Sequence, residues 1–141
     1  MLEQFLTQTE GIFSLNLLLS LAIGYIIGLE RETRGKSAGV STHILVVGGS
    51  MAFSFLSSTM FSDPARIASG IVTGIGFLGA GIIFKENASK IINLTTAASI
   101  WFAAGIGMAI GFGYYSLAII ASIFAIVALR VPHLALKSKK R

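Results

Sequence analysis

Acidic and basic side chains are mixed most closely in this 141-residue sequence between positions 30 and 36. Glu30 and Glu32 each precede a basic residue by four positions, an order and spacing that stabilise a helix. The run predicts a solvated helix end that fixes the topology of the chain. A docking surface for another protein and a clasp against segment 85–90 are the alternatives. The functional candidates in this run are Glu30, Arg31, Glu32 and Lys36.

Polar residues also occur at the edges of apolar segments. His43 is the one ionisable residue held within an apolar span, and ionisable groups inside a membrane are functional candidates. A bond from His43 to a nearby carbonyl is the structural alternative. Asn93, Thr95 and Thr96 open another apolar segment, where they are expected to cap a helix and to form interhelical hydrogen bonds.

A third group precedes the apolar span that begins at residue 67. Asp63 is suited to a helix N-cap, Pro64 to the first helical position, and Arg66 stands close enough to pair with Asp63. The simple interpretation is a well-formed helix start. The alternative is that Asp63 and Arg66 form a gate or a ligand-sensing pair.

The residues favour no catalytic function. The chain has no cysteine, paired carboxylates or nucleophile triad, and no metal-ligand cluster. Residues 74–79 match the glycine pattern GxGxxG, but they lie in an apolar span and lack the acid that a dinucleotide site requires about 20 residues later. We therefore expect no enzyme, no catalytic residue and no cofactor. Binding of a Mg²⁺ ion is left open, although no carboxylate site supports it.

Composition indicates a membrane protein. Hydrophobic residues make up 54% of the chain and charged residues 12%, against about 25% charged residues in a soluble domain. The uncharged spans are 11–29, 37–62, 67–84 and 91–129. A membrane crossing needs about 20 apolar residues, so the last span is expected to turn at the glycines and aromatics of 111–115.

These spans predict a single all-α domain over 1–141 with five transmembrane helices packed through small residues. The expected helices are 12–29, 41–61, 66–84, 93–110 and 114–130. Five crossings place ten of the eleven basic residues on one side. By the positive-inside rule the N-terminus is outside and the C-terminus cytoplasmic. The basic tail 137–141 is expected to contact anionic lipid, and no nucleic acid is expected as a partner.

Small residues recur at one-turn spacing in the third and fourth predicted helices, and such residues let helices approach closely in lipid. Packing within the chain and a face for homo-oligomerisation are both left open. The packing candidates are Gly70, Gly74, Gly76, Gly79, Gly81 and Gly107.

Several motifs in chain order resemble the membrane domain of the MgtC/SapB family. They are Gly28-Leu29-Glu30-Arg31-Glu32, Thr42-His43, Asp63-Pro64, Gly74-Ile75-Gly76-Phe77-Leu78-Gly79-Ala80-Gly81 and Leu94-Thr95-Thr96-Ala97-Ala98 with Trp101. Ser41 stands where the family often has Arg, and Gly70 where Gln is common. These departures put the family roles of both positions in doubt. The family's C-terminal soluble domain has no counterpart in residues 131–141.

The resemblance implies a multi-pass protein of the bacterial inner membrane that is linked to growth in low magnesium. Some family members restrain the membrane ATP synthase, and the family is also labelled a magnesium transporter. Because none of the six acids falls near the middle of an apolar span, our first hypothesis is that the chain regulates membrane machinery. The expected partners are the lipid bilayer, other copies of the chain and a membrane ATPase. A transporter or channel for Mg²⁺ or another cation is the alternative.

Overall fold

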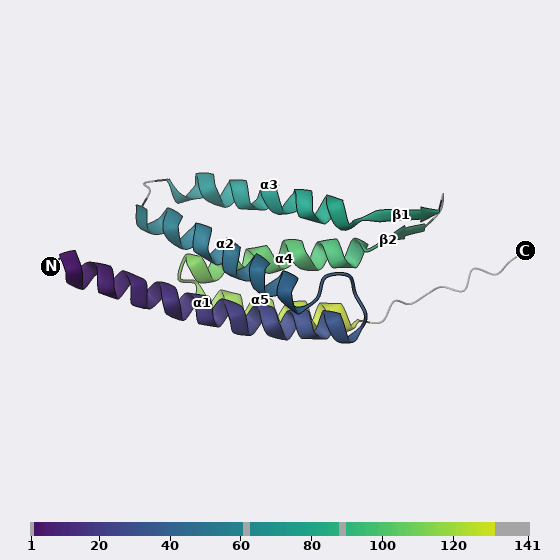
Figure 1. Cartoon of the computed structure of the whole chain (residues 1–141), viewed down its shortest axis with the longest axis horizontal. Coiled ribbons are helices and arrows are strands. Elements are labelled where there is room, and N and C mark those ends of the chain that lie inside the picture. The colour runs from purple at the N-terminus through teal and green to yellow at the C-terminus, as the bar shows by residue number, and fades with distance from the viewer. Residues whose placement is uncertain (1, 61–62, 88–89, 132–141) are drawn as a thin grey trace, which may run out of the picture.

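The computed structural model describes residues 2–60, 63–87 and 90–131. Five helices run back and forth along one long axis (Figure 1). They are α1 (Leu2–Thr33), α2 (Val40–Met60), α3 (Pro64–Ile82), α4 (Leu94–Gly111) and α5 (Tyr115–Arg130). The predicted break in the longest uncharged span is confirmed, because α4 ends at Gly111 and α5 begins at Tyr115.

Four of these helices are long enough and apolar enough to cross a membrane. They span Thr7–Thr33, Val40–Met60, Pro64–Ile82 and Leu94–Gly111. The fifth, α5, is apolar but has only 16 residues. The first helix begins about ten residues earlier than expected from the sequence.

A short antiparallel hairpin interrupts the helical chain between α3 and α4. It consists of β1 (Phe84–Asn87) and β2 (Lys90–Ile92), with Phe84 opposite Ile92 and Lys85 opposite Ile91. The expected helix 66–84 ends earlier, at Ile82. Pairing between the two strands satisfies their own backbone groups, and the carbonyl of Ile82 at the end of α3 accepts from Asn93 Nδ2. The hairpin was not foreseen in the all-helical prediction.

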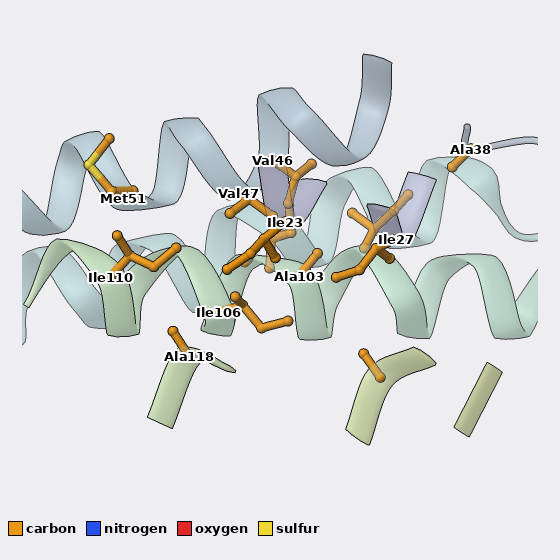
Figure 2. Packing of buried hydrophobic residues seen from close by; sticks show 14 of the residues in the cluster. Ile23, Ile27, Ala38, Val46, Val47, Met51, Ala103, Ile106, Ile110 and Ala118 are labelled. Carbon is orange, nitrogen blue, oxygen red and sulfur yellow. The ribbon is translucent and has the colours of Figure 1, made fainter. Parts of the chain in front are cut away.

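The apolar core lies where α1, α2 and α4 meet (Figure 2). Ile27, Val47, Met51, Ile106 and Ile110 are at most 1% exposed. Their side chains fill the space between three different helices. The three helices therefore form a single packed unit, against which α3 and α5 lie.

Two glycines let α4 approach α2 at backbone distance. A Cβ atom at Gly107 would overlap the carbonyl oxygen of Val47, and one at Gly111 would lie 2.6 Å from the Cβ of Ser54. Real Cβ atoms do not approach so closely, so a side chain at either position forces the helices apart. Gly24 of α1 has the same role against α2, because a Cβ atom there would lie 2.6 Å from the Cα of Ile44.

Of the six glycines predicted to pack helices, Gly107 alone makes such a close approach within the chain. Gly79 is in ordinary contact with Ala97, at 3.7 Å. The other four have no atom within 4 Å of their Cβ positions: Gly70, Gly74, Gly76 and Gly81. None of the four makes a close helix contact within the described chain, although Gly70 and Gly74 line a cavity between α2 and α3. Their role in self-association stays a prediction.

Candidate functional site at the charged end of the bundle

The charged run of the sequence forms the last turns of α1 and the loop that follows. Arg31 is 1% exposed, and its Nη2 donates a hydrogen bond of 2.8 Å to the Oγ1 of Thr96 in α4. Its Nε has no hydrogen-bond partner in the described part of the chain. A buried guanidinium thus links α1 to α4 through two residues that are 65 positions apart in sequence.

Beside Arg31, the ring of His43 is fully buried between α2 and α4. Its Nδ1 lies 2.9 Å from the carbonyl oxygen of Gly39, and its Nε2 lies 3.3 Å from the Oγ of Ser99. A carbonyl oxygen only accepts, so Nδ1 is the donor of the first bond. The hydroxyl of Ser99 donates to the carbonyl of Thr96 at 2.8 Å. His43 therefore has the carbonyl bond that the structural interpretation predicted, and it joins the network around Thr96.

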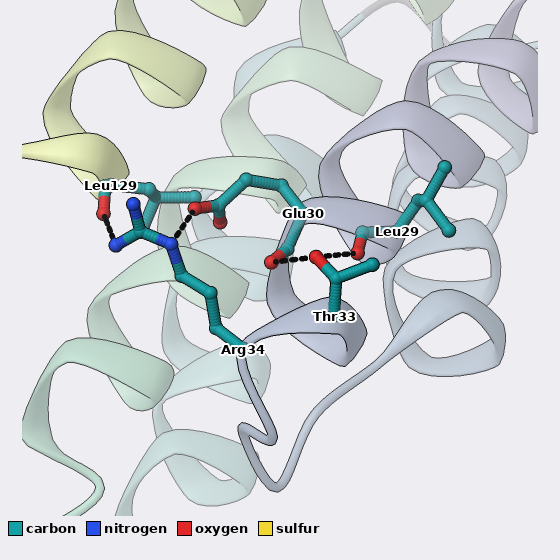
Figure 3. Close-up of polar contacts among 5 residues, drawn as sticks. All are labelled: Leu29, Glu30, Thr33, Arg34 and Leu129. Atoms are coloured by element: carbon teal, nitrogen blue, oxygen red, sulfur yellow. Dashed lines mark hydrogen bonds and ion pairs between the residues drawn. The ribbon is translucent and has the colours of Figure 1, made fainter.

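Glu30 forms the predicted pair with Arg34, and this pair reaches a third element. Arg34 Nε lies 2.9 Å from Glu30 Oε1, and Arg34 Nη1 donates to the carbonyl of Leu129 in α5 at 3.1 Å (Figure 3). The side chain of Glu30 is only 6% exposed. Its Oε2 has no hydrogen-bond partner among the residues described. We call Glu30, Arg31, Arg34, His43 and Thr96 the charged-end cluster.

The second predicted pair, Glu32 with Lys36, is not formed in the described structure. Because α1 ends at Thr33, Lys36 does not lie one helical turn after Glu32. Glu32 Oε2 instead accepts a hydrogen bond of 2.9 Å from the backbone amide of Val40, the first residue of α2. Glu32 thus caps a neighbouring helix. The predicted clasp with 85–90 depends on side chains outside the described ones.

Asn93 stands at the N-cap position of α4, and its backbone carbonyl accepts the first helical bond, from the amide of Ala97. It takes a left-handed backbone conformation, with φ 65°, and makes no side-chain cap hydrogen bond. Its Nδ2 instead donates to the carbonyl of Ile82 at the end of α3, and its Oδ1 accepts from the hydroxyl of Ser37 at 2.8 Å. Thr95 is exposed, whereas Thr96 is buried in the charged-end cluster.

Asp63 and Arg66 lie at the start of α3, at the opposite end of the bundle (Figure 1). Asp63 stands at the N-cap and Pro64 follows at the first helical position, as predicted. However, Asp63 makes no side-chain cap bond, and the structure gives no ion pair between it and Arg66 within residues 63–87. Both side chains are exposed to their surroundings.

The structure also reveals a row of buried hydroxyl groups. It consists of Ser20 in α1 and Ser50, Ser54 and Ser57 in α2, each at most 6% exposed. The Oγ atoms of Ser20 and Ser54 have no hydrogen-bond partner among the residues described. Sequence reasoning missed this row, along with Ser99 of the site. The spacing of three to four residues along α2 was its only signal.

No metal site is visible in the described ranges. Residues 2–60, 63–87 and 90–131 contain no group of three or more His, Cys, Asp and Glu side chains placed to hold an ion. At the charged end, Arg34 instead pairs with Glu30, and Arg31 is hydrogen-bonded to Thr96.

A bundle of apolar helices with its buried ionisable groups gathered at one end defines a class of membrane-type helical protein. Within that class, the chain belongs to the MgtC family, whose sequence pattern matches residues 17–135. The resemblance to this family noted in the sequence is thereby confirmed.

Curated relatives agree with this assignment. The chain is 44% identical to a protein of Escherichia coli (strain K12) named "Putative magnesium transporter YhiD", over 86% of this chain and 60% of the relative. It is 44% identical to "Protein MgtC" of Salmonella typhimurium (strain LT2), over 82% of this chain and 50% of that protein. An uncharacterised protein of Haemophilus influenzae is 38% identical over 85% of this chain.

The chain thus spans about half to three fifths of the length of these relatives. No solved structure matches it.

Proposed function

We propose that this chain is a non-enzymatic, multi-pass protein of the bacterial inner membrane that regulates other membrane machinery when magnesium is scarce. The charged-end cluster carries this proposal. Its ionisable groups sit at one end of the bundle and bind protein groups from α1, α2, α4 and α5. Such an arrangement holds the bundle end in one shape, which suits a surface that another protein recognises. The names of the relatives supply the link to magnesium.

The proposed topology has five crossings, with the N-terminus outside and the charged end in the cytoplasm. At 1.5 Å per residue, the 16 residues of α5 span about 24 Å, against a hydrocarbon core of about 30 Å. Local thinning of the bilayer and the long side chain of Arg130 at its end accommodate such a mismatch. Ten of the eleven basic residues then face the cytoplasm. The tail 137–141, with four of them, lies outside the described residues.

The partner that we propose is a membrane ATPase, either a transport ATPase or the ATP synthase. Arg34 of the cluster and the neighbouring Glu32 offer contacts for it, because both lie at the surface of the charged end. Purification from native membranes in a mild detergent tests this directly. A subunit of such an ATPase that co-purifies with the wild type, but not with an Arg34→Ala variant, supports regulation.

Loss of the cluster's charges is expected to abolish this function. We predict that Glu30→Ala combined with Arg31→Ala prevents complementation of growth in low magnesium, because the buried network loses its central groups. The measurement is growth of a deletion strain, with protein abundance in the membrane determined in parallel. An Arg66→Ala variant at the other end is the control. Normal growth of the double variant at wild-type abundance contradicts the proposal.

Cation transport is the second candidate function, and the row of buried hydroxyls favours it. Ser20, Ser50 and Ser54 place oxygen atoms within the apolar core, and two of these oxygens have no partner among the residues described. Hydroxyl oxygens can line a path for a cation or proton. Saturable Mg²⁺ flux into liposomes containing the purified protein, lost on Ser54→Ala or His43→Ala, would reverse the ranking of the two functions.

A further inference from the structure

A cavity of about 560 Å³ opens between α1 and α5 at the charged end. One wall is apolar and is formed by Ile26 and Leu29 of α1 with Ile126 of α5. Ile26 and Leu29 are 52% and 42% exposed, so this wall is open to the bundle's surroundings. The other wall holds Glu30, Arg34 and Arg130, so the cavity has an apolar side and a charged side.

The charged side carries one positive charge in excess. Glu30 is neutralised by Arg34, which lies 2.9 Å from it. Arg130 makes no ion pair or hydrogen bond with any residue that the structure describes. Arg130 is the last residue of α5, and it follows Leu129, whose carbonyl accepts the hydrogen bond from Arg34 Nη1. Two guanidinium groups from facing helices thus line one space, and one of them has no protein partner there.

Two further groups at the cavity lack partners. The Nη2 of Arg34 makes no bond in the part of the chain described, since Nε and Nη1 take the two bonds of this side chain. The Oε2 of Glu30 is buried and accepts no hydrogen bond among the same residues. A buried carboxylate oxygen without a donor is costly, so a ligand that donates a hydrogen bond there is favoured. The cavity therefore offers donors for an anion and an acceptor for a hydroxyl group.

We propose that this cavity binds an anionic glycerophospholipid of the phosphatidylglycerol type. Its phosphate binds Arg130 and the Nη2 of Arg34, and a headgroup hydroxyl donates to Glu30 Oε2. One acyl chain lies along Ile26 and Leu29. Basic pockets between transmembrane helices bind such headgroups, and a phosphodiester's single negative charge matches the excess positive charge. This inference rests on the membrane placement proposed above, but not on the regulatory role.

Native mass spectrometry of the full chain, in micelles containing equal amounts of phosphatidylglycerol and phosphatidylethanolamine, tests the proposal. We expect the wild type to retain phosphatidylglycerol preferentially. Arg130→Gln is expected to reduce that retention about tenfold, which corresponds to the loss of one charge-assisted hydrogen bond. The matched control is Arg66→Gln, an exposed arginine at the opposite end of the bundle, which is expected to retain as much phosphatidylglycerol as the wild type. Equal retention of the two lipids by the wild type overturns the proposal.

Two further arms separate the cavity from other sources of lipid binding. Replacing Lys137, Lys139, Lys140 and Arg141 with glutamine removes the basic tail, and the lipid preference is expected to persist. If this tail variant loses the preference while Arg130→Gln keeps it, the cavity is not the site. Replacing phosphatidylglycerol with phosphatidylmethanol, a phosphodiester of the same charge without headgroup hydroxyls, is expected to weaken retention by the wild type. Unchanged retention excludes the bond assigned to Glu30. Circular dichroism checks that each variant remains folded.

Discussion

Arg31 is the residue whose environment places the strongest demand on the fold. It is almost completely buried, and the described structure gives its guanidinium one side-chain hydrogen bond, to Thr96. A buried charge is costly unless it is paired and hydrogen-bonded. Glu30 precedes it in α1 and brings a carboxylate close by. The bond to Thr96 therefore ties the end of α1 to the start of α4.

We predict that Thr96→Val destabilises the protein by about 1–3 kcal/mol, because the buried guanidinium loses its hydroxyl partner while the side-chain volume is kept. Thermal or denaturant unfolding in detergent measures the effect. Thr95→Val is the matched control, since Thr95 is the same residue type next in sequence but exposed. Equal stability of the two variants contradicts the role assigned to Thr96.

At the scale of the elements, small residues set how closely the helices approach. Both tight glycines of α4, Gly107 and Gly111, face the backbone of α2, next to Ser50 and Ser54. Serine and glycine together allow this approach, which supplies the dispersion contacts that hold helices together in lipid. By contrast, glycines of α3 such as Gly74 have no atom within 4 Å of their Cβ positions, and Gly74 lines a cavity between α3 and α2.

Replacing Gly107 with alanine is predicted to destabilise the bundle by about 1–3 kcal/mol, as expected for overpacking against a neighbouring backbone. Gly105→Ala is the control, because it adds the same methyl group to the same helix with no atom within 4 Å. Unfolding of both variants in detergent gives the comparison. A Gly107→Ala protein as stable as the Gly105→Ala protein would show that α4 can move away from α2 without cost.

The open glycine face of α3 leads to a prediction about assembly. We expect Gly74→Leu to reduce self-association in detergent while leaving the monomer folded, because no atom lies within 4 Å of its Cβ position. Analytical ultracentrifugation of the variant and the wild type measures the change. Gly113→Leu is not a suitable control, since its backbone has φ 79° and a side chain there is strained. Gly105→Leu, at another open position, is the better one. An unchanged oligomer distribution argues against association through α3.

For the whole molecule, the distribution of exposed apolar and charged groups is the governing feature. Large apolar side chains such as Leu18, Phe77 and Ile120 are more than half exposed along the helices, whereas charges gather at the bundle ends. A surface of this kind is stable in a lipid environment and prone to aggregation in water. The two ends of the bundle then meet the two faces of the bilayer.

The proposed threading predicts that reporters fused at Thr33 and at Ser138 both lie in the cytoplasm. Thr33 ends α1, and Ser138 follows α5, so the two sites share a side when α2 to α5 all cross and lie on opposite sides when α5 alone does not. Paired reporters, one active in the cytoplasm and one active outside it, measure this. A reporter at Ser138 that is active outside would show that α5 lies on the membrane surface instead of crossing it.

Much of the fold could be predicted from the sequence, because bilayer thickness sets the length that an uncharged segment needs to cross as one helix. The break near Gly111 and the start of α3 at Pro64 followed from residue types alone. The hairpin at Phe84–Ile92 did not, since two short strands have too few residues for a clear pattern. The Glu30–Arg34 pair was predictable because it depends only on helical spacing.

Residue order along the chain determined the family, the helices and the pairing of charges within one helix, since these depend on neighbours in sequence. The tertiary structure alone decided which helix faces meet. It brought Arg31 to Thr96 across 65 residues, turned Glu32 toward the start of α2, and placed Gly107 rather than Gly74 at a close helix contact. The physical reason is that a periodic pattern marks every small-residue face of a helix, while contact with a particular neighbour depends on how the whole bundle packs.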